Sequence, residues 1–129
     1  MAQSLPPDPW LAMLRDTVTA LVRRDGPDLS SRQMAVFLTC YLREGGHTVR
    51  GLAAELNVSK PAITRALDRL GALDLIRRKV DPLDRRSVLV ARTLKGAAYL
   101  RDVRAILNEA ATSAGRRAAA SGEMRRASA

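Results

Sequence analysis

Two stretches near the start of the chain repeat apolar residues at helical spacing. The first follows three early prolines and ends at the Asp-Gly-Pro sequence of residues 25–27, so we expect a helix over residues 8–24. The second begins after Ser30, which forms with Gln33 the pattern of a capping box, and it ends at the glycine pair of residues 45–46. Its apolar residues fall on one stripe that belongs in a core: Met34, Phe37, Leu38, Tyr41 and Leu42.

The next segment predicts a short helix, a tight turn and a second helix. The short helix covers residues 50–57, and Asn57 is suited to end it in a left-handed conformation. Ser59 is a good N-cap for the second helix, residues 60–73. Pro61 is tolerated in the first turn because amide protons there have no intrahelical acceptor.

The last part of the chain predicts a β-hairpin followed by a long helix. Two β-capable runs, residues 75–80 and 87–92, are joined by a segment of hairpin composition. Thr93 can cap a helix over residues 93–114, whose apolar positions alternate spacings of three and four: Leu100, Val103, Leu107, Ala110 and Ala114. Residues 115–129 contain only Met124 as a large apolar anchor, so we expect them to fray into a basic tail.

The order of these elements is that of a winged helix-turn-helix. We therefore predict a mainly α fold with a small β-hairpin as the wing. The winged core is expected over residues 30–92 of a single domain. The helices over residues 8–24 and 93–114 flank it and are expected to form a dimer interface.

The helix over residues 60–73 separates into two faces when successive residues are placed ~100° apart. One face is apolar and belongs in the core: Ile63, Ala66, Leu67, Leu70 and Leu73. In this fold class the helix enters the major groove of DNA, where base edges and phosphates require short polar side chains and cations. The candidate DNA-contacting residues on and around its other face are Ser59, Lys60, Pro61, Thr64, Arg65, Asp68 and Arg69.

Three of these residues have chemistry that suggests a role. Arg65 can donate two parallel hydrogen bonds to guanine, and Thr64 can contact a thymine methyl group. Asp68 is repelled by phosphate, which leaves two interpretations open. It orients a neighbouring arginine, or it accepts a hydrogen bond from cytosine.

The predicted hairpin carries a second set of candidate DNA-contacting residues. Asp84 is expected to hold the guanidinium of Arg85 or Arg86 in a charge-assisted pair, which makes the tip rigid and cationic. Such a tip suits a narrow minor groove, where negative potential is concentrated. Arg78, on the preceding strand, adds a further cation.

The distribution of charge supports an acidic partner. The net charge is +9; residues 1–49 carry five charges of each sign, whereas residues 50–92 carry ten basic and five acidic side chains. A basic excess on the predicted helix-turn-helix and wing points to double-stranded DNA. For the arginines of residues 115–129, a flexible arm on DNA and a solubilising role both remain open.

The composition also favours association of two copies. Alanine accounts for 21 residues and aromatic side chains for only four, so the core must be built mainly from leucine and valine. Surplus apolar helix faces would then gain most by pairing with a second copy. The candidate dimerisation residues are Trp10, Leu11, Leu14 and Val18 in the first helix and Leu100, Val103 and Leu107 in the last.

Several kinds of chemistry are not expected. The single cysteine, Cys40, and single histidine, His47, exclude an intramolecular disulfide and a four-ligand Cys/His zinc site, and we expect no cofactor. Cys40 is expected to pack in the core, with a redox sensor as the alternative. No arrangement of nucleophile, base and orienting partner is identifiable, so we do not expect an enzyme.

We also expect neither a secretory signal nor a membrane-spanning segment. The first residues have neither the basic start nor the apolar run of a secretory signal, and no segment approaches 18 uninterrupted apolar residues. We expect a cytoplasmic protein that associates with the nucleoid when bound to DNA.

Residues from about 30 to 98 resemble the MarR (multiple-antibiotic-resistance regulator) family of bacterial transcription factors. The matching segments are residues 48–53, 57–70, 75–78 and 94–96, together with the wing sequence Asp81-Pro82-Leu83-Asp84-Arg85-Arg86-Ser87, which is the most specific of them. The resemblance implies a homodimer that binds a pseudo-palindromic operator. It also implies a repressor released by a small phenolic or lipophilic effector or by thiol oxidation.

The region after the wing departs from the family pattern. Family members usually have two helices there, whereas the residues after 94 predict one long helix in this chain. The hypothesis is a homodimeric, sequence-specific DNA-binding repressor. The alternatives are a winged-helix adaptor that binds another protein and a nonspecific architectural DNA-binding protein.

Overall fold

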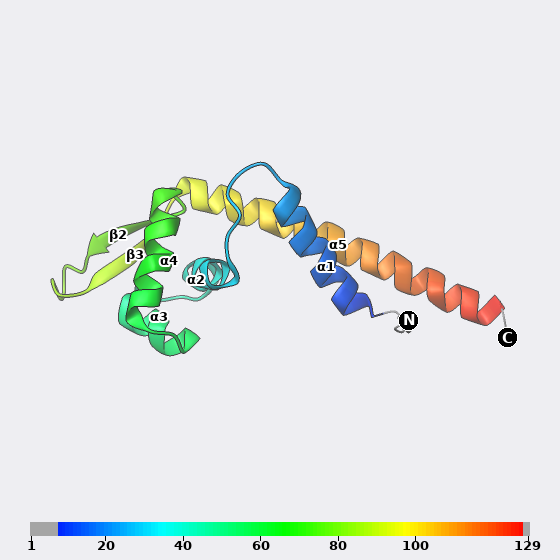
Figure 1. The fold of residues 1–129 in the computed structure, drawn as a ribbon, viewed down its shortest axis with the longest axis horizontal. Coiled ribbons are helices and arrows are strands. Elements are labelled where there is room, and N and C mark those ends of the chain that lie inside the picture. The colour runs from blue at the N-terminus through cyan, green and yellow to red at the C-terminus, as the bar shows by residue number, and fades with distance from the viewer. Residues whose placement is uncertain (1–7, 128–129) are drawn as a thin grey trace. The chain divides into compact units, whose positions relative to one another are not determined.

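The computed structural model describes residues 8–127 and divides the chain into two compact units (Figure 1). The winged unit comprises residues 27–101. The terminal unit comprises the described parts of residues 1–26 and 102–129. The long helix α5, Leu94–Ala127, contributes its first two turns to the winged unit and the rest to the terminal unit.

The winged unit has the predicted order of elements. Its members before α5 are α2 (Ser31–Leu42), β1 (His47–Thr48), α3 (Val49–Leu56), α4 (Lys60–Ala72), β2 (Ile76–Val80) and β3 (Val88–Arg92). The predicted mainly α fold with a hairpin wing is confirmed. The predicted bounds in this unit agree with the observed ones to within a residue, except that α2 ends at Leu42, before the glycine pair of residues 45–46.

Local signals in the sequence account for the helix ends. The capping box is present, because the Ser30 hydroxyl accepts from the Gln33 amide at 3.1 Å and the Gln33 side chain accepts from the Ser30 amide at 2.9 Å. Asn57 ends α3 with φ 54°, as its residue type favours. The Ser59 hydroxyl accepts from the Ala62 amide at 3.2 Å and so caps α4.

The sheet has one strand more than the predicted hairpin. Its order is β1-β3-β2, and both pairings are antiparallel. In β1, Thr48 lies opposite Leu89 of β3. The sequence pattern does not predict this strand, because a two-residue strand carries no alternation of its own. This pairing fixes the start of α3 beside the wing.

The core of the winged unit lies between α2, α3, α4 and the first turns of α5. Phe37 is its centre, with its ring 4.5 Å from the Tyr41 ring and 5.2 Å, edge to face, from the Tyr99 ring. The largest fully buried side chains are Phe37, Leu52, Ile63, Leu67, Leu70, Leu75, Ile76 and Val36. The core face predicted for α4 is therefore confirmed, except that Leu73 is only half-buried.

A buried network joins α2 to the start of α5. The Tyr41 hydroxyl donates to the Leu75 carbonyl at 2.6 Å and accepts from the Thr93 amide at 3.0 Å. The Thr93 hydroxyl donates to the Asp74 carbonyl at 2.7 Å and accepts from the Gly96 amide at 2.9 Å, which confirms Thr93 as the cap of the last helix. The network fixes how the chain leaves the wing and enters α5.

Cys40 packs in this core, as predicted. Its side chain is buried, and burial raises the pKa of the thiol to about 11. Because the thiolate is the reactive form, Ellman's reagent at pH 8 should label Cys40 in the folded protein on the order of a hundredfold more slowly than in the urea-unfolded chain. Rapid labelling of the folded protein would contradict core packing and favour the redox-sensor alternative.

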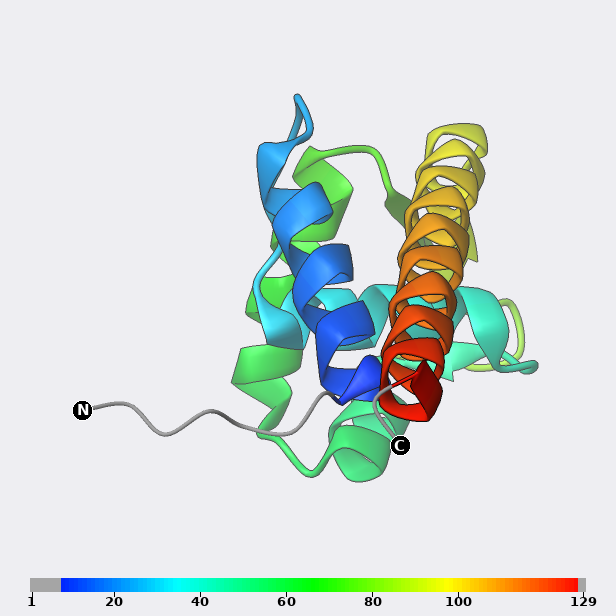
Figure 2. The ribbon, with the colours of Figure 1, turned by 90° about the vertical axis from the view of Figure 1, so that its right-hand side faces the viewer.

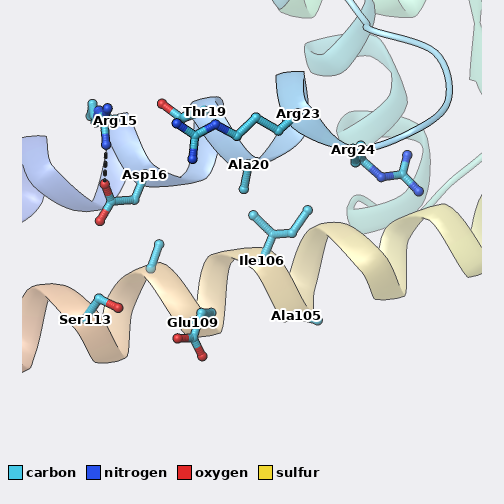
Figure 3. A pocket seen from close by; sticks show the side chains of 11 residues that line it. Arg15, Asp16, Thr19, Ala20, Arg23, Arg24, Ala105, Ile106, Glu109 and Ser113 are labelled. Atoms are coloured by element: carbon cyan, nitrogen blue, oxygen red, sulfur yellow. Dashed lines mark hydrogen bonds and ion pairs between the residues drawn. The ribbon is translucent and has the colours of Figure 1, made fainter.

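The terminal unit is built from α1, Pro9–Arg23, and the rest of α5 (Figure 2). Asp8 caps α1, accepting from the amides of Trp10 and Leu11 at 3.0 and 3.2 Å. Ala20 of α1 and Ile106 of α5 face each other between the two helices (Figure 3). Arg24 pairs with Asp102 across the two helices at 2.8 Å.

The end of α5 differs from the prediction. Residues 115–127, expected to fray, continue the helix, while residues 128–129 lie outside the described part of the chain. Alanine and arginine are strong helix formers, and each interior glycine costs only about 1 kcal/mol. Arg117 also pairs with Asp16 of α1, which lowers the pKa of that carboxyl and holds the helix past Ala114.

One apolar face of α1 is exposed. None of the residues of α1 is buried, and its largest side chain, Trp10, is 75% exposed. The exposed apolar side chains fall on one stripe of α1, which we call the α1 stripe: Trp10, Leu11, Leu14, Val18 and Val22. On α5, Leu107 is exposed, and Leu100 and Val103 are half-buried.

Between residues 8 and 127, every helix falls short of the length or the apolarity needed to cross a bilayer. The same described residues contain no group of three or more histidine, cysteine, aspartate or glutamate side chains that could hold a metal ion.

Candidate nucleic-acid interface

Helix α4 presents one polar face outside the core. The predicted contact residues Lys60, Pro61, Arg65, Asp68 and Arg69 are exposed, and Thr64 is half-buried. The opposite face is closed by Ala62, Ile63, Ala66, Leu67 and Leu70, all of which are buried. Burial of that face fixes the rotation of the helix about its axis. The polar face is consequently held rigidly on the surface of the winged unit.

The turn before α4 sets where the helix begins. Asn57 reverses the chain in the left-handed conformation, and the Val58 amide donates to the Ala53 carbonyl at 3.1 Å. Ser59 then caps α4, so that Lys60 occupies the first helical position. The N-terminal turn of α4 therefore presents Lys60 and Pro61 at the surface.

An ion pair ties α4 to the wing. The Arg78 guanidinium on β2 donates to the Asp68 carboxylate on α4 at 2.5 Å, and both side chains are partly exposed. This contact matches the first interpretation of Asp68, in which it orients a neighbouring arginine. Arg78 is consequently held against the helix. Sequence reasoning named both residues without pairing them.

The turn of the wing is organised around two carboxylates. Asp81 accepts from the Leu83 amide at 2.8 Å. Asp84 accepts from the Arg86 amide at 3.1 Å through one oxygen and from the Ser87 hydroxyl at 3.3 Å through the other. These bonds make the turn rigid by means of its own backbone.

The predicted pairing of Asp84 with the guanidinium of Arg85 or Arg86 was therefore wrong. Within the described residues Asp84 forms no ion pair with a guanidinium; it holds the backbone amide of Arg86 instead. The reason is geometric, because a carboxylate two residues before an amide reaches that amide in an Asx-type turn more easily than it reaches a side chain pointing outward. Arg85 and Arg86 are both exposed.

A cavity of about 430 Å³ lies where α3, α4 and the wing meet. Three of its lining residues, Lys60, Asp84 and Arg86, were predicted site residues. The others include Thr48, Arg50 and Ser87, which sequence reasoning did not select. We call this space the wing cavity. The place of Arg50 depends on the β1–β3 pairing. Because the sequence does not specify that pairing, it offered no signal for Arg50.

The cations around the wing cavity differ from three arginines of the winged unit that are held in ion pairs. Arg43, Arg77 and Arg78 are paired with Glu55, Asp74 and Asp68 respectively. Arg50, Lys60 and Arg86 form no ion pair with any described residue. Their charge is consequently available to a ligand from outside the chain.

Comparison with known proteins identifies the family of this fold. The MarR family model matches residues 27–87. Among curated proteins no significant match is found. Among solved structures, a MarR transcriptional regulator from Methanosarcina mazei Go1 is 27% identical to this chain. Its TM-score is 0.61, and the match covers 76% of this chain and 70% of that one.

Two further structures are similar. CouR from Rhodococcus jostii RHA1, bound to p-coumaroyl-CoA, is 30% identical with a TM-score of 0.60, over 76% of this chain and 66% of that one. The S. aureus MepR–DNA complex is 19% identical with a TM-score of 0.66, over 91% of this chain and 90% of that one, and shows the fold alone. The winged helix-turn-helix of this chain therefore matches the MarR family model and is similar to those of MarR regulators.

Proposed function

We propose that this chain is a sequence-specific, DNA-binding transcriptional regulator, in which α4 enters the major groove and the wing contacts the adjacent minor groove. The observation that carries the proposal is the rigidly held polar face of α4 beside unpaired cations of the wing. MepR in complex with DNA and the regulator from M. mazei, which share this fold, support it.

The regulator is proposed to act as a homodimer on a pseudo-palindromic operator. The α1 stripe supports this step, since a row of exposed apolar side chains on one helix gains free energy when a second copy covers it. Two recognition helices would then enter major grooves about one helical turn apart, ~34 to 36 Å. The family resemblance adds two further proposals, that the regulator represses transcription and that a small molecule controls it. CouR bound to p-coumaroyl-CoA is an example of a similar protein that holds a small molecule.

Selection of binding sites from a pool of random duplexes tests the proposed function. We expect recovered sequences to contain inverted half-sites whose centres lie about one helical turn apart. Recovery of unrelated sequences bound with similar affinity would support the architectural alternative instead. An absence of DNA binding at low salt would favour the adaptor that binds another protein.

Replacing Arg65 by alanine should relax base preference at one position in each half-site. Arg65 is exposed on the polar face of α4, and a bidentate contact to guanine discriminates by roughly 1 to 3 kcal/mol. Binding measured against a panel of single-base operator variants should lose discrimination at that position.

Arg86→Ala provides the contrast for Arg65→Ala, because it should weaken binding to all sequences about equally and reduce the salt dependence. Arg65→Ala protein that keeps the full preference of the wild type at every position would remove Arg65 from base reading.

A further inference from the structure

We propose that the wing cavity binds one backbone phosphate of DNA and that Arg50 is its main ligand, assisted by Lys60 and Arg86. The inference rests on the proposed function and adds to it a site and a residue that reading the sequence did not select. Its ligand is a phosphodiester, which carries a single negative charge on two non-bridging oxygens.

The fold brings the three cations together from separate elements. Arg50 lies in the first turn of α3, beside the wing because Thr48 pairs with Leu89 of β3. Lys60 is the first residue of α4, and Arg86 comes from the turn of the wing. All three line the same cavity. The arrangement is independent of any one flexible loop, because the strand pairing and the Ser59 cap hold two of the three positions.

The wall of the wing cavity is net positive. Asp84 is the carboxylate among its lining residues, and both of its oxygens already accept hydrogen bonds from the wing itself. The three cations have no ion-pair partner among the described residues. A guanidinium donates two parallel hydrogen bonds to phosphate oxygens, and an ammonium adds a point charge, so this set of side chains suits a single phosphate.

One of the two hydroxyls of the cavity fits the same ligand. The Thr48 oxygen accepts from the Gly51 amide at 3.0 Å, which leaves its own hydrogen as a donor. The Ser87 hydroxyl, by contrast, is bonded to Asp84. Thr48 therefore adds a neutral donor next to Arg50 on the α3 side of the cavity.

The position of the cavity identifies the phosphate as one of the DNA backbone. A major groove and its neighbouring minor groove are separated by one sugar–phosphate backbone. If α4 occupies the first and the wing the second, that backbone must pass between them. The wing cavity lies there, lined by Lys60 of α4 and Arg86 of the wing. A contact of this kind positions the protein without reading sequence.

Salt dependence of DNA binding tests the assignment of Arg50. Arg50→Gln should weaken binding about tenfold at low salt and lower the slope of log K against log salt by about 0.9, equally for operator and unrelated duplexes. Arg50→Lys keeps the charge and should retain the slope while losing part of the affinity. Arg101→Gln, in α5 and outside the cavity, removes the same charge and is the matched control.

A second experiment locates the phosphate. Operators carrying one neutral methylphosphonate at a time should reveal one position per half-site where the wild type loses about tenfold in affinity and Arg50→Gln protein loses nothing further. The thermal unfolding midpoints of Arg50→Gln and Arg50→Lys protein should match that of the wild type, because the exposed Arg50 side chain makes no ion pair with any described residue.

The outcomes separate this inference from the proposed function. If Arg50→Gln behaves like Arg101→Gln while the wild type still binds DNA with steep salt dependence, the wing cavity is not a phosphate site and the regulator function stands. If the methylphosphonate effect persists in Arg50→Gln protein, the phosphate is held by other residues and the assignment of Arg50 fails. If the wild type binds no DNA, both proposals fail.

Discussion

Replacing Gly96 by alanine is expected to destabilise the winged unit by about 4 kcal/mol or more. A methyl group at this position would lie 1.7 Å from the Tyr41 hydroxyl oxygen and 2.3 Å from the Leu75 carbonyl oxygen. Neither separation is possible between real atoms, so Tyr41 would have to leave its site. The loss is a large part of the roughly 5 to 15 kcal/mol that stabilises a typical domain.

Tyr41 has no alternative place within the core. Its ring packs against Phe37, with the guanidinium of Arg92 5.7 Å from the ring centre. Its hydroxyl satisfies the Leu75 carbonyl and the Thr93 amide. Displacement would combine the strain of overpacking, about 1 to 3 kcal/mol, with unsatisfied buried groups at about 1 to 3 kcal/mol each.

Thermal unfolding followed by circular dichroism measures the effect. We expect the midpoint of Gly96→Ala protein to fall by about 15 °C or more, if the protein folds at all. Gly71→Ala is the matched control, because the new methyl group would meet Ile76 at an ordinary 3.9 Å inside α4. That variant should gain roughly 0.5 to 1 kcal/mol from higher helix propensity. Equal midpoints for the two variants would contradict the close packing at Gly96.

The predictable part of the fold is the part that depends on neighbours in sequence. The Ser30 capping box, the left-handed Asn57 and the Ser59 cap each involve residues no more than three apart, and each was found where the sequence indicated it. The buried face of α4 follows from the same kind of local periodicity. Together these features position the polar face of α4.

The unpredicted parts of the candidate site depend on residues distant in sequence. The Arg78–Asp68 pair joins a strand to a helix ten residues away, and no spacing rule specifies it. Arg50 reaches the wing only because β1 pairs with β3, a register set by sheet geometry and a two-residue strand. For Asp84 the error was local: the sequence suggested a guanidinium as its partner, whereas the backbone amide of Arg86 is nearer.

The end of α5 shows how two local arguments can conflict. The scarcity of large apolar residues beyond Ala114, where Met124 is the exception, argued for fraying, whereas the alanine and arginine content favours a helix. The helix continues to Ala127, and the Arg117–Asp16 pair joins its extension to α1. Propensity was therefore the better guide, because an ion pair from a distant element stabilised what apolar packing did not.

The α1 stripe leads to the second large effect. Leu14→Asp should convert the proposed dimer to monomers and weaken operator binding by about two to three orders of magnitude. Leu14 is 58% exposed in the single chain, so aspartate there costs a monomer little. In an isologous dimer the same position would be covered in both copies, and an unpaired buried charge costs about 3 to 5 kcal/mol.

Two measurements detect the change. Sedimentation equilibrium gives the dissociation constant of the dimer directly. Trp10 is the chain's single tryptophan and belongs to the α1 stripe, so its emission should shift to the red as wild-type protein is diluted below that constant. Leu14→Asp protein should show the red-shifted emission at every concentration.

Leu94→Asp is the matched control for Leu14→Asp. Leu94 is 91% exposed and begins α5, where an acidic residue favours the helix dipole, and it lies outside the α1 stripe. This variant should dimerise and bind operator like the wild type. If Leu14→Asp protein also dimerises with the wild-type constant, the α1 stripe is not the interface between copies.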